Sequence, residues 1–258
     1  MRKLCHLFIT LLLVSGCATE QAATKPYPPH IAAAEAQASV AEVLDKARAS
    51  DRLAMLVLGA NWCHDSVDFA NMLAQPELES WIGQHYVVGL YNLGYLDDFQ
   101  TYLAPYGVPV IYGTPTVLVI DPKTNQLLNP EFHYYWRNAS QLTAKDARKY
   151  FSIYLVPPVE GPDPSESLAQ ALGQIDEFEA RQADRITRAY AALGPMMRAY
   201  EAGNPPADFD DKWANLAGMR SKITGDLENL RQSAREQDAA GADPIVLDFP
   251  EYPLFIDP

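Results

Sequence analysis

Hydrophobic residues in the first 155 positions alternate between unbroken apolar runs and stretches with a period of three or four residues. The runs contain no charged residue, which is typical of strands buried on both faces of a sheet. They span 53–59, 86–93 and 116–120. The periodic stretches predict helices, and they span 36–50, 64–81, 97–103 and 141–155.

A polar turn and an aromatic segment follow the third run. Residues 121–125 (DPKTN) predict a turn, and residues 132–136 (FHYYW) predict a fourth strand. Arg137 and Asn138 come next, and we expect them to be turn and cap residues. The resulting order, helix–strand–helix–strand–helix–strand–strand–helix, predicts an α/β fold.

The second part of the chain has a different pattern. Prolines and glycines at 157–164 mark a boundary. Beyond it, two apolar stripes with helical spacing are separated by a break at 203–206, which predicts an antiparallel helical hairpin over 164–237. The aperiodic tail holds aromatic residues that we expect to pack on the surface, namely Phe249, Tyr252 and Phe255. We therefore divide the chain into a domain at 36–156 and a helical extension with an irregular tail at 157–258.

The N-terminus has the pattern of an export signal. A basic start is followed by an apolar run at 7–14, which is too short to span a bilayer, and residues 1–16 therefore predict a signal peptide. Residues 14–17 (VSGC) resemble the bacterial lipobox, which implies that Cys17 is lipidated and that 17–35 form a tether. An ordinary secretory signal and a retained membrane anchor are the alternatives.

Lipidation would place the mature protein on a membrane of the cell envelope, facing the periplasm. By the same resemblance, Ala18 after the lipidated cysteine favours the outer membrane over the inner one. Cys5 would leave with the signal peptide and Cys17 would become a thioether. Cys63 would then be the one free thiol of the mature chain.

Charge and motif content narrow the function classes. The net charge of −13 argues against nucleic acid as a partner, because phosphates are bound by lysine and arginine. The histidines and cysteines lack metal-ligand spacing, so we expect no metal site. No phosphate-binding loop or dinucleotide fingerprint occurs, and we expect no cofactor.

The candidate reactive residue is Cys63, which follows an apolar strand and opens a helix. A thiol there faces unpaired backbone N–H groups and the positive end of the helix dipole, and both favour the thiolate nucleophile. A protonated His64 would act in the same direction, and Trp62 would shield the sulfur. Asp65 and Ser66 suit the first turn of a helix, and the Ser66 hydroxyl could hydrogen-bond the Cys63 sulfur.

Two motifs carry a resemblance to a known family. Residues 59–66 (GANWCHDS) and 113–116 (GTPT) resemble the W-C-x-x-C motif and the cis-proline loop of the thioredoxin superfamily. The resemblance covers about half of the chain and implies a thioredoxin-like fold, a central mixed sheet flanked by helices, here with a C-terminal helical hairpin. It also implies that the Thr114–Pro115 bond is cis and that this loop lies against Cys63 and binds substrate.

The motif departs from the family at two positions. Ser66 replaces the second cysteine, and Val57 replaces the buried acid that assists it. Both losses remove attack by a second thiol on a mixed disulfide. The resemblance therefore implies monothiol exchange, in which Cys63 reacts with protein thiols or disulfides or with glutathione mixed disulfides and an external thiol completes the cycle. The alternative is a non-catalytic binding module whose hairpin supplies a partner surface.

Overall fold

The computed structural model describes residues 25–96, 98–156 and 163–253. The predicted signal peptide and Cys17 lie outside these residues, as do Phe255 and most of the predicted domain boundary. No helix of the described part is long and apolar enough to cross a membrane.

A four-stranded mixed sheet forms the centre of the first domain. The strands are β1 (Leu53–Gly59), β2 (Tyr86–Asn92), β3 (Thr116–Asp121) and β4 (Gln126–Leu127), in the order β2-β1-β3-β4. β1 pairs in parallel with β2 and antiparallel with β3, and β4 pairs antiparallel with β3. β1 is central and almost fully buried, as its unbroken apolar run predicts. The three strands predicted from apolar runs are confirmed.

The predicted fourth strand is wrong. β4 forms at the end of the predicted turn, whereas the aromatic segment leads into a 3-10 helix, η2 (Tyr135–Gln141). The physical reason is Asn129, whose side chain accepts from the Val119 N–H and donates to the Val117 carbonyl, both at 2.8 Å. This amide takes two backbone groups of β3, and the aromatic segment keeps only one bond to the strand, from the Val117 N–H to the His133 carbonyl at 2.8 Å, so no regular strand forms there.

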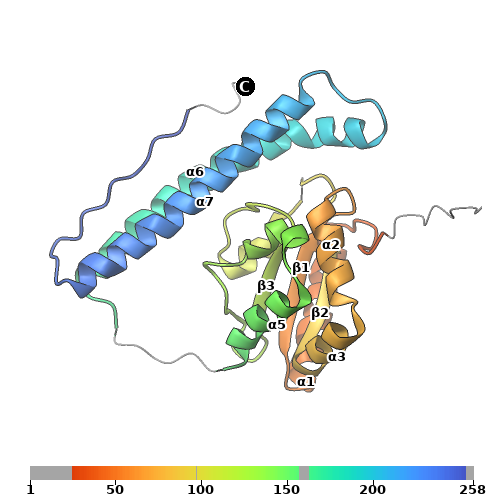
Figure 1. Ribbon diagram of the computed structural model, residues 1–258, viewed down its shortest axis with the longest axis horizontal. Helices are drawn as coiled ribbons and strands as arrows, with labels where there is room; N and C mark the ends of the chain where they lie inside the picture. Colours follow the sequence, from red (N-terminus) through yellow and green to blue (C-terminus); the bar gives the residue numbers. More distant parts are fainter. Residues whose placement is uncertain (1–24, 97, 157–162, 254–258) are drawn as a thin grey trace, which may run out of the picture.

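The helices cover both faces of the sheet (Figure 1). In chain order they are α1 (Ala33–Ala49), α2 (His64–Leu73), α3 (Pro76–His85), α4 (Gln100–Leu103), η1 (Ala104–Tyr106), η2, α5 (Ala144–Ser152) and η3 (Ile153–Leu155). Alternation along β1 sends Met55 and Val57 into one core with α2, α3 and α5, and Leu56 and Leu58 into another. α1 begins three residues before the predicted start of the domain.

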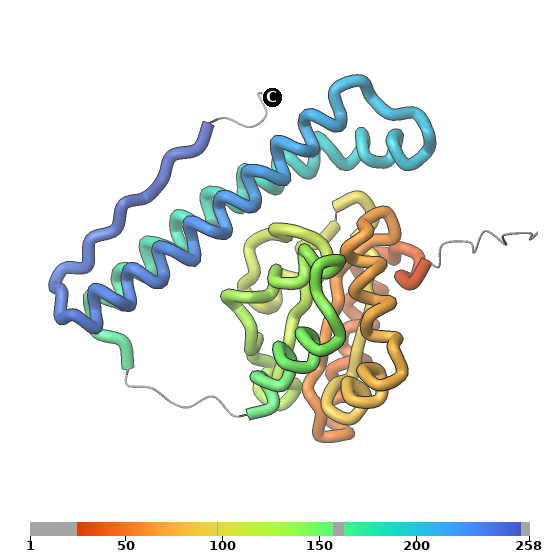
Figure 2. The backbone as a smooth tube through the Cα atoms, in the orientation of Figure 1, coloured from red at the N-terminus to blue at the C-terminus, as the bar shows by residue number. Residues whose placement is uncertain are grey.

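Two long antiparallel helices make up the extension, as predicted. They are α6 (Glu166–Glu201) and α7 (Phe209–Ala239), which lie side by side along their length (Figure 2). The Ser165 hydroxyl caps α6 by accepting from the Leu168 N–H at 3.0 Å. The tail runs back along the helices, and its Phe249 ring packs 5.2 Å from the ring of Phe178.

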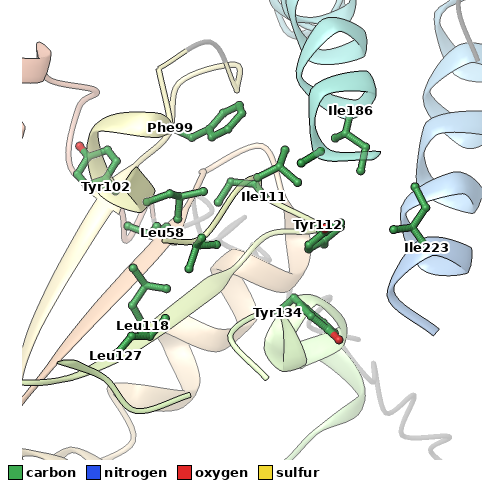
Figure 3. Close-up of a cluster of buried hydrophobic side chains, with 14 of the residues drawn as sticks. Leu58, Phe99, Tyr102, Ile111, Tyr112, Leu118, Leu127, Tyr134, Ile186 and Ile223 are labelled. Atoms are coloured by element: carbon green, nitrogen blue, oxygen red, sulfur yellow. The ribbon is translucent and has the colours of Figure 1, made fainter. Parts of the chain in front are cut away.

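The hairpin and the domain share one hydrophobic core. Figure 3 shows Ile111, Tyr112 and Tyr134 of the domain facing Ile186 of α6 and Ile223 of α7. The buried hydroxyls at this interface are paired: Tyr190 donates to the Ile111 carbonyl at 2.7 Å, and Tyr112 donates to Glu179 at 2.9 Å. The extension is therefore packed against the domain rather than appended to it.

Candidate functional site

The Cys63 thiol lies at the first turn of α2, against the proline loop. Cys63 is the N-cap of α2, and its Sγ donates to the Thr114 carbonyl oxygen at 3.3 Å. The Thr114–Pro115 bond is cis. The thiol is partly exposed and forms no disulfide. The two motifs that are fifty residues apart in sequence thus meet, because β1 ends and β3 begins at the same edge of the sheet.

The Trp62 side chain, next to Cys63, is held by contacts with two parts of the chain. Its indole N–H donates to the Gly94 carbonyl at 2.7 Å. The ring also packs edge-to-face with Trp213 of α7, with ring centroids 5.9 Å apart. Trp62 is therefore held between the domain and the hairpin.

His64 and Asp65 have different environments, although they are adjacent. The His64 side chain is exposed, with Nε2 3.1 Å from Asp65 Oδ2. Asp65 is buried, and its other oxygen accepts from the Ser140 N–H at 2.9 Å and from the Ser140 hydroxyl at 2.8 Å. Asp65 thus ties the start of α2 to η2. No group of three His, Cys, Asp or Glu among the described residues could hold a metal ion.

Ser66 does not hydrogen-bond the Cys63 sulfur, so that expectation is wrong. The Ser66 hydroxyl is fully buried and has no hydrogen-bond partner. The cause is its direction: a Cβ on Gly59 would lie 2.8 Å from Ser66 Oγ and 2.5 Å from the Tyr27 hydroxyl. Ser66 therefore faces β1 and Tyr27, and only a glycine fits at position 59.

Tyr27 is a site residue that the sequence did not indicate. Its backbone N–H donates to the Asn61 side chain at 3.0 Å, and its carbonyl accepts from the same amide at 2.9 Å. The phenol is buried without a hydrogen-bond partner of good geometry. Burial raises the pKa of Tyr27 far above its ordinary value, the charge of Cys63 adds to the rise, and the Ser66 hydroxyl opposes it. The phenol is neutral beside the thiol.

The neighbouring prolines continue this attachment. The Pro28 carbonyl accepts from the Asn92 side chain at 2.9 Å, and His30 Nδ1 donates to the Asn92 carbonyl at 2.8 Å. Residues 27–30 thus lie across the ends of β1 and β2. This part of the predicted tether is bound to the domain in the structure.

A cavity of about 420 Å³ opens beside Cys63 between the domain and the hairpin. The predicted residues Trp62, Cys63, His64, Asp65 and Thr114 line one side. The hairpin lines the other side with Met197, Tyr200, Phe209, Trp213, Ala217 and Arg220. The cavity therefore joins residues that are more than a hundred positions apart.

Arg137 also lines this cavity, whereas the sequence predicts only a turn residue at this position. Its guanidinium donates to the Thr224 hydroxyl of α7 at 2.7 Å. A Cβ on Gly113, just before the proline loop, would lie 2.7 Å from Arg137 Cβ. The absence of a side chain at position 113 therefore lets Arg137 approach the loop. Asn138 is exposed and lines the cavity too.

Comparisons with known proteins give one weak structural similarity. No family model and no curated protein matches the sequence. A solved structure of a disulphide isomerase from Xylella fastidiosa Temecula1 is similar, with 22% identity and a TM-score of 0.45. The similarity covers 52% of this chain and 98% of that chain. The fold and the site therefore rest on the geometry of this chain alone.

Proposed function

We propose that this chain is a thioredoxin-like protein that exchanges thiols and disulfides through Cys63 alone. The observation that carries the proposal is the position of Cys63 Sγ, 3.3 Å from the Thr114 carbonyl at the cis-proline loop and at the start of α2. The Cys63 side chain makes no cap hydrogen bond to α2 in the structure, and a thiolate at this position would face the positive end of the helix dipole. The loop offers backbone groups to an extended substrate.

The proposed reaction has two balanced steps. The Cys63 thiolate attacks one sulfur of a substrate disulfide, forming a mixed disulfide and releasing the other sulfur as a thiolate that takes up a proton. A thiolate from a protein or from glutathione then attacks the mixed disulfide and restores Cys63. The number of disulfides is unchanged, so no outside oxidant or reductant is required.

The surroundings of Cys63 support resolution by an external thiol. Ser66 cannot act as a second thiol, and Val57 is a fully buried apolar residue without a proton to transfer. Tyr27 is neutral at physiological pH, as a tyrosine with the ordinary pKa of 10 is, and burial raises its pKa further. None of these three neighbours can break the mixed disulfide.

The test is to trap the mixed disulfide. The mature chain is incubated with oxidised glutathione and with disulfide-containing proteins, and adducts are identified by mass spectrometry without reducing agent. We expect adducts on Cys63 that an added thiol releases, and none with Cys63→Ala. A chain that forms no adduct with any disulfide would contradict the proposal.

A non-catalytic binding role is the second candidate, favoured by the hairpin. Its two helices share a core with the domain and form one side of the cavity at Cys63. Such a surface suits a partner that binds without chemistry. Cells carrying Cys63→Ala separate the two functions: a wild-type phenotype supports binding, and the phenotype of a full deletion supports exchange.

We also propose export and attachment to the membrane of the cell envelope through a lipid on Cys17. The support is the VSGC segment at 14–17 after a short apolar run. Metabolic labelling with a radioactive fatty acid is expected to mark the wild-type chain and to fail with Cys17→Ala. Cell fractionation would then place the labelled protein in the outer or the inner membrane.

A further inference from the structure

Two guanidinium groups, from Arg137 of η2 and Arg220 of α7, line the cavity beside Cys63. Arg220 is only 9% exposed, so its charge is largely removed from water. Burial lowers the pKa of Arg137, the charges of Tyr134 and Glu228 oppose this, and the charge of Arg220 lowers it further. The two positive charges therefore act on the same small space.

Both arginines are held by neutral groups. Arg220 donates to the Tyr190 hydroxyl at 2.7 Å and lies over the ring of Trp213, 5.1 Å from its centroid. Arg137 donates to the Thr224 hydroxyl and lies over the ring of Tyr134. Among the described residues, neither arginine is within ion-pair distance of a carboxylate. The Nε of Arg220 is buried without any partner.

Elsewhere in the hairpin, a partly buried arginine does form ion pairs with carboxylates. Arg231, eleven residues further along α7, is paired with Glu179 and lies near Asp176. The sequence holds 33 acidic residues against 20 basic ones. A buried charge is normally paired because removing it from water is costly. Two partly buried arginines that form no direct ion pair among the described residues, next to a thiol, are therefore a site that favours an anion, although Glu228 lies near enough to Arg137 to act on its charge.

The cavity also limits the size and shape of the anion. A volume of about 420 Å³ is within the range of small-molecule pockets. Its walls include the rings of Trp62, Trp213 and Tyr112, which suit an apolar body. Two exposed acids, Glu201 and Asp210, line it as well, so a highly charged polyanion would be repelled.

We infer that Arg137 and Arg220 bind a carboxylate of the substrate, and that Cys63 exchanges with small disulfides that carry a carboxylate. This inference rests on the proposed function, because it names the substrate class of the same site. The carboxylate fixes one half of the disulfide in the cavity. Cys63 attacks the sulfur of that half, and the other half leaves as a thiolate.

The test compares two chromogenic disulfides that differ in charge. Dithiobis(nitrobenzoate) carries a carboxylate on each half, whereas 4,4′-dithiodipyridine is neutral. We expect Arg220→Met to slow the reaction of Cys63 with the first reagent about tenfold, because the variant loses one hydrogen-bonded charge contact with the carboxylate. The reaction with the neutral reagent should change less than about twofold, because it makes no such contact.

The rate with dithiobis(nitrobenzoate) divided by the rate with 4,4′-dithiodipyridine separates substrate binding from thiol activation. If Arg220 only stabilises the thiolate, both reactions slow equally and the inference is overturned. Lys222→Met is the matched control, because it removes the same charge from the same helix. Lys222 is exposed and does not line the cavity. Its ratio of rates should equal that of the wild type.

Further variants protect the test against misfolding. Arg220→Lys keeps the positive charge but loses the planar guanidinium. Arg137→Met removes the second guanidinium, which lies on η2 and not on α7. Each should lower the ratio of rates while the circular dichroism spectrum stays unchanged. A wild-type ratio in every folded variant overturns the inference and leaves the proposed function standing. A wild-type chain that reacts with neither reagent defeats the proposed function itself.

Discussion

The ring of Trp62 lies against the ring of Trp213, with centroids 5.9 Å apart and planes at 83°. Trp62 directly precedes Cys63, and Trp213 belongs to α7. An edge-to-face pair of this kind is stabilising by about 0.5–1.5 kcal/mol beyond the area it buries. The position of the hairpin is thus linked to the residue that borders Cys63.

Removing this contact should open the site. Trp213→Ala removes a half-buried ring from the cavity, so a bulky maleimide should alkylate Cys63 faster while iodoacetamide, which is small, reacts at nearly the same rate. Trp81→Ala is the control, because Trp81 packs with His85 away from the cavity. Equal acceleration by both reagents would instead indicate a change in the thiol.

The Tyr27 hydroxyl and the Tyr27 ring should contribute differently to stability. Tyr27→Phe removes a buried hydroxyl without a hydrogen-bond partner, so the free energy of unfolding should stay constant or rise by about 1 kcal/mol. Tyr27→Ala removes the buried ring and should lower it by about 3–5 kcal/mol. Urea denaturation measures both. A large loss with Tyr27→Phe would mean that the hydroxyl has a strong partner.

His133 should make the fold sensitive to acid. Its Nδ1 donates to the Pro130 carbonyl, its Nε2 is buried without a partner, and burial lowers the pKa of His133 from 6.5 to about 4. Between pH 7 and pH 4 the unfolded chain takes up a proton at this residue before the folded chain does. The folded state therefore loses up to about 3 kcal/mol as the pH falls through this window.

His133→Phe keeps an aromatic ring of similar size and removes this titration. The free energy of unfolding of the variant minus that of the wild type should increase by about 3 kcal/mol from pH 7 to pH 4. Denaturant unfolding at several pH values measures the difference. A difference that does not vary with pH would show that His133 is accessible to protons in the folded state.

Ser66→Cys should turn a one-thiol site into a two-thiol site. Position 66 is one turn from Cys63, and rotation of the new side chain away from Tyr27 would bring its thiolate to the Cys63 mixed disulfide. Attack there forms a disulfide between positions 63 and 66 and releases the substrate thiol. Adducts that persist in the wild type should then disappear within the trapping time. Ser167→Cys adds a thiol on α6 instead and should leave the adducts intact. Persistent adducts in Ser66→Cys would mean that position 66 cannot reach the sulfur.

The sequence predicts what depends on local pattern. Three unbroken apolar runs identify β1, β2 and β3, and two helical stripes identify α6 and α7. The meeting of Cys63 and Thr114 is expected from the resemblance of two short motifs, and in the structure it results from the antiparallel pairing of β1 with β3. The strands and helices are each encoded within a few neighbouring residues, whereas the meeting of Cys63 and Thr114 is marked by two short motifs far apart in sequence.

Features that depend on distant contacts are not visible in the pattern. Tyr27 reaches the site through Asn61, thirty-four positions away. Arg220 occurs in a long helix with many charged residues, and only the packing of α7 on the domain shows that it is buried. The aromatic segment at 132–136 has the pattern of a strand, but the side chain of Asn129 takes two of the backbone groups of β3 that such a strand would pair with. Such contacts arise only when the chain is folded.

The core shared by the two halves has a consequence for the order of folding. Residues 33–155 complete the sheet and its flanking helices, but Ile111, Tyr112 and Tyr134 lack the helices that cover them until the hairpin docks. An apolar surface stays open to water until α6 and α7 pack against it. A half-folded chain is then prone to aggregation, and the thiol gains its second wall only when the hairpin is in place.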